Sequence, residues 1–304
     1  MRVSETFRLT DDMDISMTLP TMLPQGRDEL LAWCRQVDEG PWVGLAIPER
    51  ITYTSSSWTA HLAAAAALTE RVKLWTTIIV LPAHSAVQTA KDLATVDQIC
   101  GGRLCAGLGV GGREQDFEAV EAPFARRWSR LDEQVAMMQR VWSGEPPFEG
   151  SAPVGPPPVQ AGGPPLYSGA MGPKALARAA NWAVGVVDGS VTGANVASLQ
   201  GVVSRVQEAW KNAGRDETPY VATTLWYALG SGAAERLHDY AYTYLEIFGP
   251  EMAGAMADAA HASSPEALRQ AVDAAAEAGC DELFLVPTTT DVTELDRTRE
   301  ALNL

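Results

Sequence analysis

The sequence predicts a (β/α)₈ barrel, because strand-like and helix-like segments alternate along nearly the whole chain. Eight segments have the apolar composition of buried strands, and most are followed by a segment with helical character. The length of 304 residues suits one such barrel. An open doubly wound sheet is the alternative that the same alternation allows. We find no usable internal repeat and no Gly/Ser linker, so we expect a single domain over 1–304 with loop insertions.

The predicted strands are short runs rich in Val, Ile, Leu and aromatic residues. They span 14–19, 42–47, 72–81, 103–108, 166–170, 182–187, 220–229 and 283–287. The segment 72–108 is the most informative, because a strand, a helix at 87–99 and a second strand form a βαβ unit, which indicates a parallel sheet. Glycines at 107–112 follow at the carboxyl end of that second strand, where parallel α/β barrels build their sites.

The intervening helices are predicted from periodicity, propensity and capping residues. In the clearest case apolar residues recur at intervals of four, three, four, three and four: Phe124, Trp128, Leu131, Val135, Met138 and Trp142. Ser264, Pro265 and Glu266 predict a helix start, and Gly279 predicts its end. Other helices are expected at 27–38, 61–68, 87–99, from 173, and at 196–213, 233–247, 252–260 and 291–302. The Pro- and Gly-rich stretch 143–165 is predicted to be a long loop.

Composition excludes several classes of function. The formal net charge of −15 argues against nucleic acid or an anionic membrane as a partner. Cys34, Cys100, Cys105 and Cys280 form neither a metal-ligand spacing nor a disulfide framework, so we expect buried thiols in a reducing cytoplasm. The first residues lack an apolar signal core, and no uncharged run reaches about 18 residues, so we expect neither export nor membrane spanning. No cluster of His and carboxylates predicts a metal site.

Several segments carry a family resemblance, among them Gly-Leu-Gly-Val-Gly-Gly-Arg-Glu-Gln-Asp-Phe at 107–117. The others are 71–82, 91–97, 101–104, 124–133, 168–174 and 278–287. Together they are similar to the bacterial luciferase-like family of flavin oxidoreductases, from about residue 40 to the end and most specifically over 71–135. The resemblance implies a TIM barrel that binds FMN or the deazaflavin coenzyme F-420. It also implies an oxidoreductase that moves hydride to or from a small organic substrate, often with oxygen as co-substrate for monooxygenation.

The resemblance assigns cofactor contacts to the ends of two strands. At the position of Thr77 and Ile78, similar proteins carry a backbone bulge, often with a non-proline cis peptide, against the middle ring of the flavin. Two ordinary β-branched strand residues are the alternative. Gly109, Val110 and Gly111 are expected to let the main chain lie close to the ring, because side chains there would collide with it. A dinucleotide-binding fingerprint is a weaker interpretation, since polar residues separate these glycines from any apolar helix.

A third cofactor segment is expected just before the helix that starts at 173. It comprises Ser168, Gly169, Ala170, Met171 and Gly172. Small residues and free N–H groups at a helix start favour a phosphate, although an ordinary strand-to-helix turn has the same composition. Gln115 is expected to be a polar contact to the cofactor, and Lys174 and Arg178 could add positive charge.

Two residues are candidates for proton transfer. His84 directly follows the strand 72–81 and so falls on the catalytic rim, where an imidazole could donate or accept a proton. A rim histidine without a chemical role is the alternative. Glu49 ends the strand 42–47 and either contacts the cofactor or pairs with Arg50. Many members of the family carry His after this acid, so Arg50 puts in doubt a mechanism that uses a histidine there.

Other expectations remain open. The compact length and Ala-rich composition slightly favour the deazaflavin, and FMN with a separate reductase is the alternative. A second class of function is a flavin-binding protein without turnover. A third is a barrel aldolase or isomerase, which would need a Lys at the carboxyl end of a strand, whereas Lys73 is at the amino end of its strand. Substrate contacts, to an apolar or aromatic molecule, are expected from Tyr53, Trp58, Trp226 or Tyr227 and the 143–165 loop, with core packing as the alternative for each. A homodimer is the usual expectation for such barrels.

Overall fold

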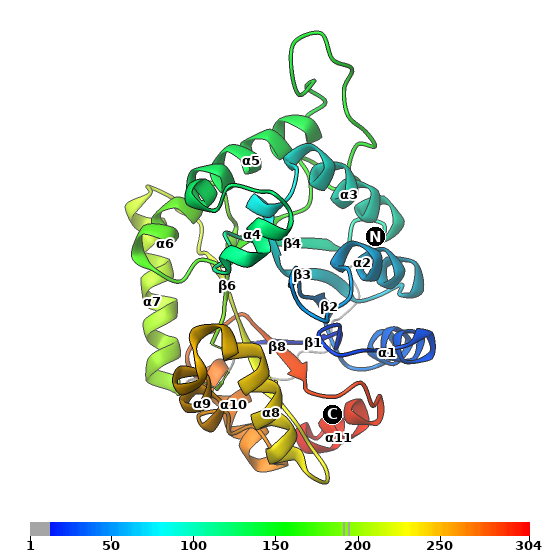
Figure 1. The fold of residues 1–304 in the computed structure, drawn as a ribbon, viewed down its shortest axis with the longest axis vertical. Coiled ribbons are helices and arrows are strands. Elements are labelled where there is room, and N and C mark those ends of the chain that lie inside the picture. Colours follow the sequence, from blue (N-terminus) through cyan, green and yellow to red (C-terminus); the bar gives the residue numbers. More distant parts are fainter. Residues whose placement is uncertain (1–12, 191, 194) are drawn as a thin grey trace.

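Eight parallel strands form the centre of the structure. The computed structural model describes residues 13–190, 192–193 and 195–304. The strands follow chain order around a closed barrel in which β1 pairs with both β2 and β8. Figure 1 shows the helices arranged around these strands. The predicted (β/α)₈ barrel is therefore confirmed, and the open-sheet alternative was wrong. The expectation that the first residues carry no apolar signal core concerns residues outside the described ranges.

Each strand lies where the sequence predicts one, with ends that differ by up to three residues. The strands are β1 Asp14–Thr18, β2 Gly44–Ile47, β3 Lys73–Val80, β4 Leu104–Gly109, β5 Leu166–Ser168, β6 Gly185–Asp188, β7 Tyr220–Tyr227 and β8 Glu282–Pro287. The strand predicted over 182–187 begins later, at Gly185, because Trp182 and Ala183 belong to the turn that follows the preceding helix, where both N–H groups donate to the Ala179 carbonyl.

The helices and 3-10 helices connect the strands on the outside of the barrel. They are α1 Arg27–Glu39, α2 Trp58–Leu68, η1 Leu81–Ala83, α3 Ala86–Ile99, α4 Glu114–Ala119, η2 Phe124–Arg126, α5 Arg127–Trp142, α6 Pro173–Ala179, α7 Val196–Asn212, α8 Ala233–Leu245, η3 Glu246–Phe248, α9 Pro250–Asp258, α10 Pro265–Glu277 and α11 Thr293–Leu302. None of the helices in the described ranges is long and apolar enough to span a bilayer.

Local sequence signals explain several helix ends. The Ser264 hydroxyl accepts a hydrogen bond of 3.2 Å from the Ala267 N–H, as expected of an N-cap, and Gly279 has a φ of +84° after the end of α10. The helix predicted from 124 begins as η2 and becomes α-helical at Arg127. The short helix α4 was not predicted, because its six residues are mostly polar.

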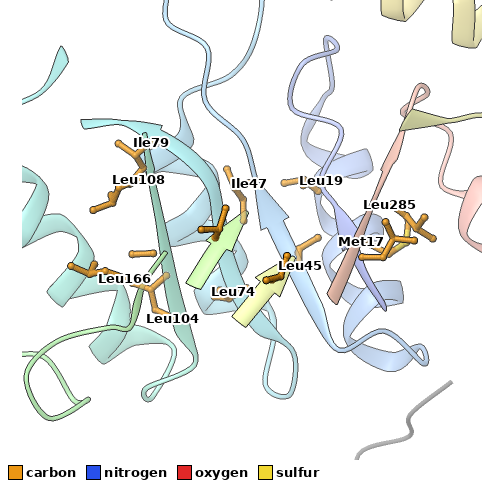
Figure 2. Packing of buried hydrophobic residues seen from close by; sticks show 14 of the residues in the cluster. Met17, Leu19, Leu45, Ile47, Leu74, Ile79, Leu104, Leu108, Leu166 and Leu285 are labelled. Atoms are coloured by element: carbon orange, nitrogen blue, oxygen red, sulfur yellow. The ribbon is translucent and has the colours of Figure 1, made fainter. Parts of the chain in front are cut away.

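The core has two layers, one outside and one inside the barrel. Side chains on the outer face of the strands pack against the helices, and Figure 2 shows those of Leu45, Leu74, Leu104 and their neighbours. The inner layer contains Trp75, Tyr167 and Phe284. The Trp75 ring centroid lies 4.5 Å from that of Tyr167 and 5.2 Å from that of Phe284. All four cysteines are buried, as predicted.

A buried carboxylate lies beneath these aromatic rings, at the amino ends of the strands. Glu282 on β8 accepts hydrogen bonds from the hydroxyls of Ser16 and, over 2.9 Å, Tyr220. Its burial raises the pKa of Glu282 to about 7, despite the hydrogen bonds that favour the ionised form. Lys73 pairs with Asp14 over 3.5 Å at the same end of the barrel. Lys73 is therefore far from the carboxyl ends where an aldolase would need its lysine.

A helical pair is inserted after β7 and before the barrel helix α10. We call residues 233–258, which comprise α8, η3 and α9, the α8–α9 cap. Its apolar face packs on residues from the carboxyl-terminal side of four strands, including Met22 after β1, Tyr53 after β2, Trp226 on β7 and Val286 on β8. The cap therefore covers one side of the barrel mouth.

Candidate functional site

The end of β3 departs from regular strand pairing. Its register with β4 is regular up to the pair Thr76–Ala106 and resumes at Ile79–Leu108, so two residues of β3 lie opposite one of β4. Those two residues are Thr77 and Ile78, and the peptide bond between them is cis. The bulge expected at this position is therefore confirmed.

The side chain of Ile78 lies against glycines from two neighbouring strand ends. A Cβ atom added to Gly109 or to Gly169 would overlap Ile78 Cδ1, and one added to Gly107 would lie 3.1 Å from Ile78 Cγ2. The sequence-based explanation of Gly109 therefore needs a correction. A side chain at Gly109 would first collide with Ile78, and only indirectly with a ligand ring.

A cavity of about 1070 Å³ opens beside Ile78 and runs outward across the ends of β4 and β5. Its inner wall contains Ile78, Gly109, Val110, Gly111 and Gly112. Its outer part lies between α5 and α6, and the middle is formed by the segment before α6. These further lining residues are Arg127, Trp128, Leu131, Asp132, Ser168, Gly169, Ala170, Met171, Gly172, Pro173, Lys174, Ala175, Arg178, Ala179 and Trp182. The cavity therefore connects the bulge of β3 with the segment before α6.

Positive side chains gather at the outer end of the cavity. Arg178 pairs with Asp132 over 2.5 Å, while Arg127 donates to the carbonyls of Gly111 and Phe124. Lys174 is exposed and forms no ion pair with any of the described residues. Trp182 Nε1, a donor, and Asp132 Oδ1, an acceptor, are buried without a hydrogen-bond partner among the described residues. Lys174 and the indole N–H of Trp182 are thus the groups here that could receive an anionic ligand, whereas the Asp132 oxygen is an acceptor and would repel one.

The cavity brings together most of the predicted cofactor residues. Nine of them line it: Ile78, Gly109, Val110, Gly111, Ser168, Gly169, Ala170, Met171 and Gly172. Thr77 is part of the bulge but is not in the lining. Gln115 is also outside, and its amide donates to Thr52 Oγ1 over 3.2 Å. The structure thus places Gln115 outside the lining of this cavity, and its expected contact with a cofactor stays a prediction.

Glu49 and His84 meet at the ends of β2 and β3. Their side chains are 2.7 Å apart between His84 Nε2 and Glu49 Oε1, and Glu49 Oε2 accepts a 2.7 Å hydrogen bond from the Val80 N–H. Glu49 thus pairs with His84 and not with Arg50, which decides one open alternative. Neither residue lines the cavity, although the pair braces β3 just beyond the bulge. Within the described residues, no group of three His, Cys, Asp or Glu could hold a metal ion.

The aromatic residues expected to contact substrate are distributed differently. Trp58 is buried, with its ring centroid 6.1 Å from that of His84. Trp226 packs against apolar residues of the α8–α9 cap. The Tyr227 hydroxyl lies 2.8 Å from Thr298 Oγ1, among the side chains that pack between strands and helices. Tyr53 stays partly exposed beneath the cap. Core packing is therefore the correct interpretation for Tyr227, and no residue of the 143–165 loop lines the 1070 Å³ cavity.

Sequence reasoning missed the helical wall of the cavity. Trp128 and Leu131 had been treated as packing residues of a periodic helix, and Trp182 as the first residue of a strand. Leu131 is buried, but the Trp128 side chain is 40% exposed at the cavity. A basic residue beside a tryptophan, as in Arg127–Trp128, was the available signal. It could not be placed without knowing that α5 and α6 flank the same strand ends.

Comparisons with known proteins agree with this geometry. The family model described as luciferase-like monooxygenase matches residues 13–301. The structure is similar to the monooxygenase RslO1 from Streptomyces bottropensis, with a TM-score of 0.76, 22% identity, and coverage of 95% of this chain and 97% of that one. It is also similar to the coenzyme F-420 dependent tetrahydromethanopterin reductase from Methanopyrus kandleri, with a TM-score of 0.69, 19% identity, and 96% of each chain covered. A third similar structure is the oxygenating constituent of 3,6-diketocamphane monooxygenase from Pseudomonas putida in complex with FMN, with a TM-score of 0.69, 15% identity, and coverage of 96% and 97%.

Proposed function

The chain belongs to the luciferase-like monooxygenase family, and from this premise we propose that it is an oxidoreductase that uses coenzyme F-420 or FMN. It would transfer hydride to or from a small organic substrate, or monooxygenate that substrate. The observation that supports this most directly is the cavity that joins the β3 bulge to the glycine segments after β4 and β5. One similar structure is of an F-420 dependent enzyme and another contains FMN, which supports either cofactor.

The residues present fit such a cofactor. The inner wall is built from Ile78 and from the main chain at 109–112, and Gly112 leaves open space where a side chain would stand, so a flat ring could lie close to the main chain there. The outer end offers Lys174 and the unpartnered Trp182 Nε1 to a phosphorylated tail. At about 1070 Å³ the cavity is at the upper limit of typical small-molecule sites, which suits a large cofactor.

The bound cofactor would supply the hydride and redox chemistry, and the protein would supply binding and orientation. Ile78 would support one face of the ring, because the glycines at 109 and 169 leave the room that its side chain occupies at the cavity wall. Trp128 and Leu131 would exclude water from the cavity between ring and helix. Lys174 would attract the anionic tail in a protein that is otherwise strongly acidic.

We propose His84 and Glu49 as the proton-handling pair at the mouth of the barrel. If the Glu49 carboxylate accepts the hydrogen bond from His84 Nε2, then Nδ1 is the nitrogen that can accept a proton. Glu49 would keep the imidazole in this orientation while it holds the end of β3 through the Val80 N–H. The ring of Trp58 limits the space on the other side of the imidazole.

A titration of the purified protein with each cofactor tests the proposal. We expect one of the two to bind with micromolar or tighter affinity, seen as a change in its fluorescence. Failure of both to bind would refute the function. Binding without any substrate-dependent oxidation or reduction across a panel of alcohols, aldehydes, ketones and aromatic compounds would favour a storage or sensing protein. A homodimer and, for FMN, a separate reductase are also proposed, and light scattering with and without cofactor tests the former.

A further inference from the structure

We propose that Arg50 is a positioning residue that fastens the α8–α9 cap to the end of β2, so that the cap forms the substrate-side wall of the barrel mouth. The idea that a substrate binds there rests on the proposed function. The fastening itself rests on contacts of the described residues alone.

Arg50 contacts the last turn of α8 in two ways. Its NH1 group donates a 2.7 Å hydrogen bond to the main-chain carbonyl of Tyr244, and its Cζ atom lies 3.7 Å from the centroid of the Tyr244 ring. On the other side, the same Cζ atom is 5.0 Å from the ring of Tyr53, which follows β2. The guanidinium group therefore contacts one aromatic ring from each of the two elements that it joins.

The contact gives a carbonyl in the last turn of α8 a hydrogen-bond donor. Carbonyls in the last turn of an α-helix have no partner within the helix, and the partial negative charge there favours a cation. The last turn of α8 contains no basic residue of its own. Arg50 supplies both the hydrogen-bond donor and the positive charge, from an element nearly 200 residues away in sequence (|i−j| = 194).

Arginine suits this position better than lysine. Burial is the main cause that lowers the pKa of Arg50 from its ordinary value, so the cation is partly removed from water. A planar guanidinium can stack on a ring and donate sideways to a carbonyl at the same time, whereas an ammonium group cannot do both with the same geometry. Ser55 restrains the residue further, because its hydroxyl donates to the Arg50 carbonyl over 2.8 Å.

The location of the cap gives the contact its significance. The cofactor cavity lies over the ends of β4 and β5, whereas the cap packs on residues at the ends of β7, β8, β1 and β2. In a closed barrel of this strand order those two sets face each other across the mouth. In Figure 1 the strands lie between α5 on one side and α8 and α9 on the other. A substrate that approaches the inner end of the cavity would therefore meet the cap on its other side.

The chain connects the cap to the proton-handling pair. Glu49, which contacts His84, is the residue before Arg50. Displacement of the cap would pull on the end of β2 and so on the carboxylate that orients the imidazole. Arg50 thus acts through other residues, and we expect its loss to affect the substrate side while cofactor affinity is retained.

The test compares substitutions at Arg50 with matched ones at Arg215. Arg215 makes the same two kinds of contact, a hydrogen bond to the Ala183 carbonyl and a ring contact with Trp210 at 5.6 Å. It lies between α7 and β7, at the amino-terminal end of the barrel. The variants are R50K, R50M, R215K and R215M. Hydrogen exchange of residues 233–258 is measured by mass spectrometry, together with iodide quenching of the fluorescence of bound cofactor.

We expect R50M to raise amide exchange in the cap about tenfold or more and to at least double the quenching constant, with the cofactor Kd within about twofold. R50K should give an intermediate effect, and R215M should lower thermal stability without changing exchange in the cap. Unchanged cap exchange in R50M and R50K, or an equal rise in R215M, would overturn the fastening role. Faster amide exchange in the cap together with an unchanged iodide quenching constant would overturn the proposal that the cap forms the substrate-side wall. If neither cofactor binds, the proposed function and the wall role both fail, and the exchange data still decide whether Arg50 holds the cap.

Discussion

Replacement of Glu282 by Gln should make the protein more stable at alkaline pH and leave its stability nearly unchanged at mildly acidic pH. Glu282 is fully buried among the strands, and burial raises its pKa from 4.5 to about 7. Below pH 4.5 the carboxyl is protonated in both the folded and the unfolded chain. Between pH 4.5 and about 7 only the unfolded chain releases the proton, so the free energy of unfolding falls as the pH rises.

The size of the effect follows from the pKa difference. At about 1.4 kcal/mol per pH unit, the interval from 4.5 to about 7 corresponds to about 3 kcal/mol of stability lost above pH 7. Glutamine resembles the protonated acid in shape and cannot ionise. Its amide can keep one hydrogen bond to Ser16 and one to Tyr220, because either hydroxyl can rotate to accept instead of donate.

The assay is denaturant unfolding of the wild type and E282Q at half-unit intervals from pH 4.5 to pH 8.5. The difference between the two free energies of unfolding removes the contribution of the other titrating groups. We expect this difference to be within about 0.5 kcal/mol at the acidic end and about 3 kcal/mol in favour of E282Q at the alkaline end. Glu208→Gln, on the exposed face of α7, is the control and should show no trend. A difference for E282Q that does not vary with pH would refute the reasoning.

Three further predictions concern the site. Gly109→Ala should destabilise the protein by about 1–3 kcal/mol and weaken cofactor binding at least about tenfold, because the new methyl displaces Ile78. Gly112→Ala, whose Cβ meets none of the described atoms within 4 Å but lies at the cavity wall, should leave stability unchanged in calorimetry and weaken only cofactor binding in the titration. Glu49→Gln should lower kcat about tenfold or more, because it weakens a charge-assisted hydrogen bond to the His84 imidazole, while the cofactor Kd stays constant. An unchanged kcat would contradict the proposal that Glu49 and His84 handle a proton. Lys174→Met should weaken cofactor binding about threefold to tenfold at low salt and make the cofactor Kd less dependent on salt. An equal loss of affinity at 0.5 M salt, about ten times the concentration in the low-salt buffer, would exclude a charge effect.

The barrel could be predicted from sequence because its signals are local and repeated. The apolar spacing between residues 124 and 142, the cap at Ser264 and the stop at Gly279 each depend on neighbours within one or two turns. The ends of strands were less accurate. Whether Trp182 continues a strand depends on the turn that follows α6, which the composition of the segment does not encode.

The site could be predicted only in outline. Thr77 and Ile78 look like ordinary strand residues, so the bulge was accessible only through the family resemblance. The glycine at 109 could be recognised as a position without room for a side chain, but the neighbour that fills the room is Ile78, from another strand. Glu49 and His84 could both be placed on the rim, since each follows a strand, whereas their pairing across 35 positions depends on side-chain direction.

Glu282 shows the same limit in the core. A carboxylate next to Asp281 reads as the end of a loop, and the strand was predicted to start one residue later. Its inward direction is fixed by the register of β8 with β1 and β7, where Glu282 lies opposite Asp14 and Ala222. A long-range property of the closed barrel therefore decides whether this residue meets water or Tyr220.

The amino-terminal half of the barrel interior is packed with aromatic side chains, and the carboxyl-terminal half adjoins the cavity. Trp75, Tyr167 and Phe284 fill the half nearer the amino ends of the strands, and glycines at 107, 109 and 169 leave the other half for Ile78 and the adjoining cavity. The aromatic rings thus form a floor that keeps a ligand near the carboxyl ends, where the cap and the Glu49–His84 pair also lie. Substitutions below this floor should change stability with little effect on cofactor affinity, whereas a substitution at the cavity wall whose new side chain meets no described protein atom should change affinity with little effect on stability. Glu282 and Gly112 are suitable extremes, because the former is buried under the floor and the latter is at the cavity wall with free space around it.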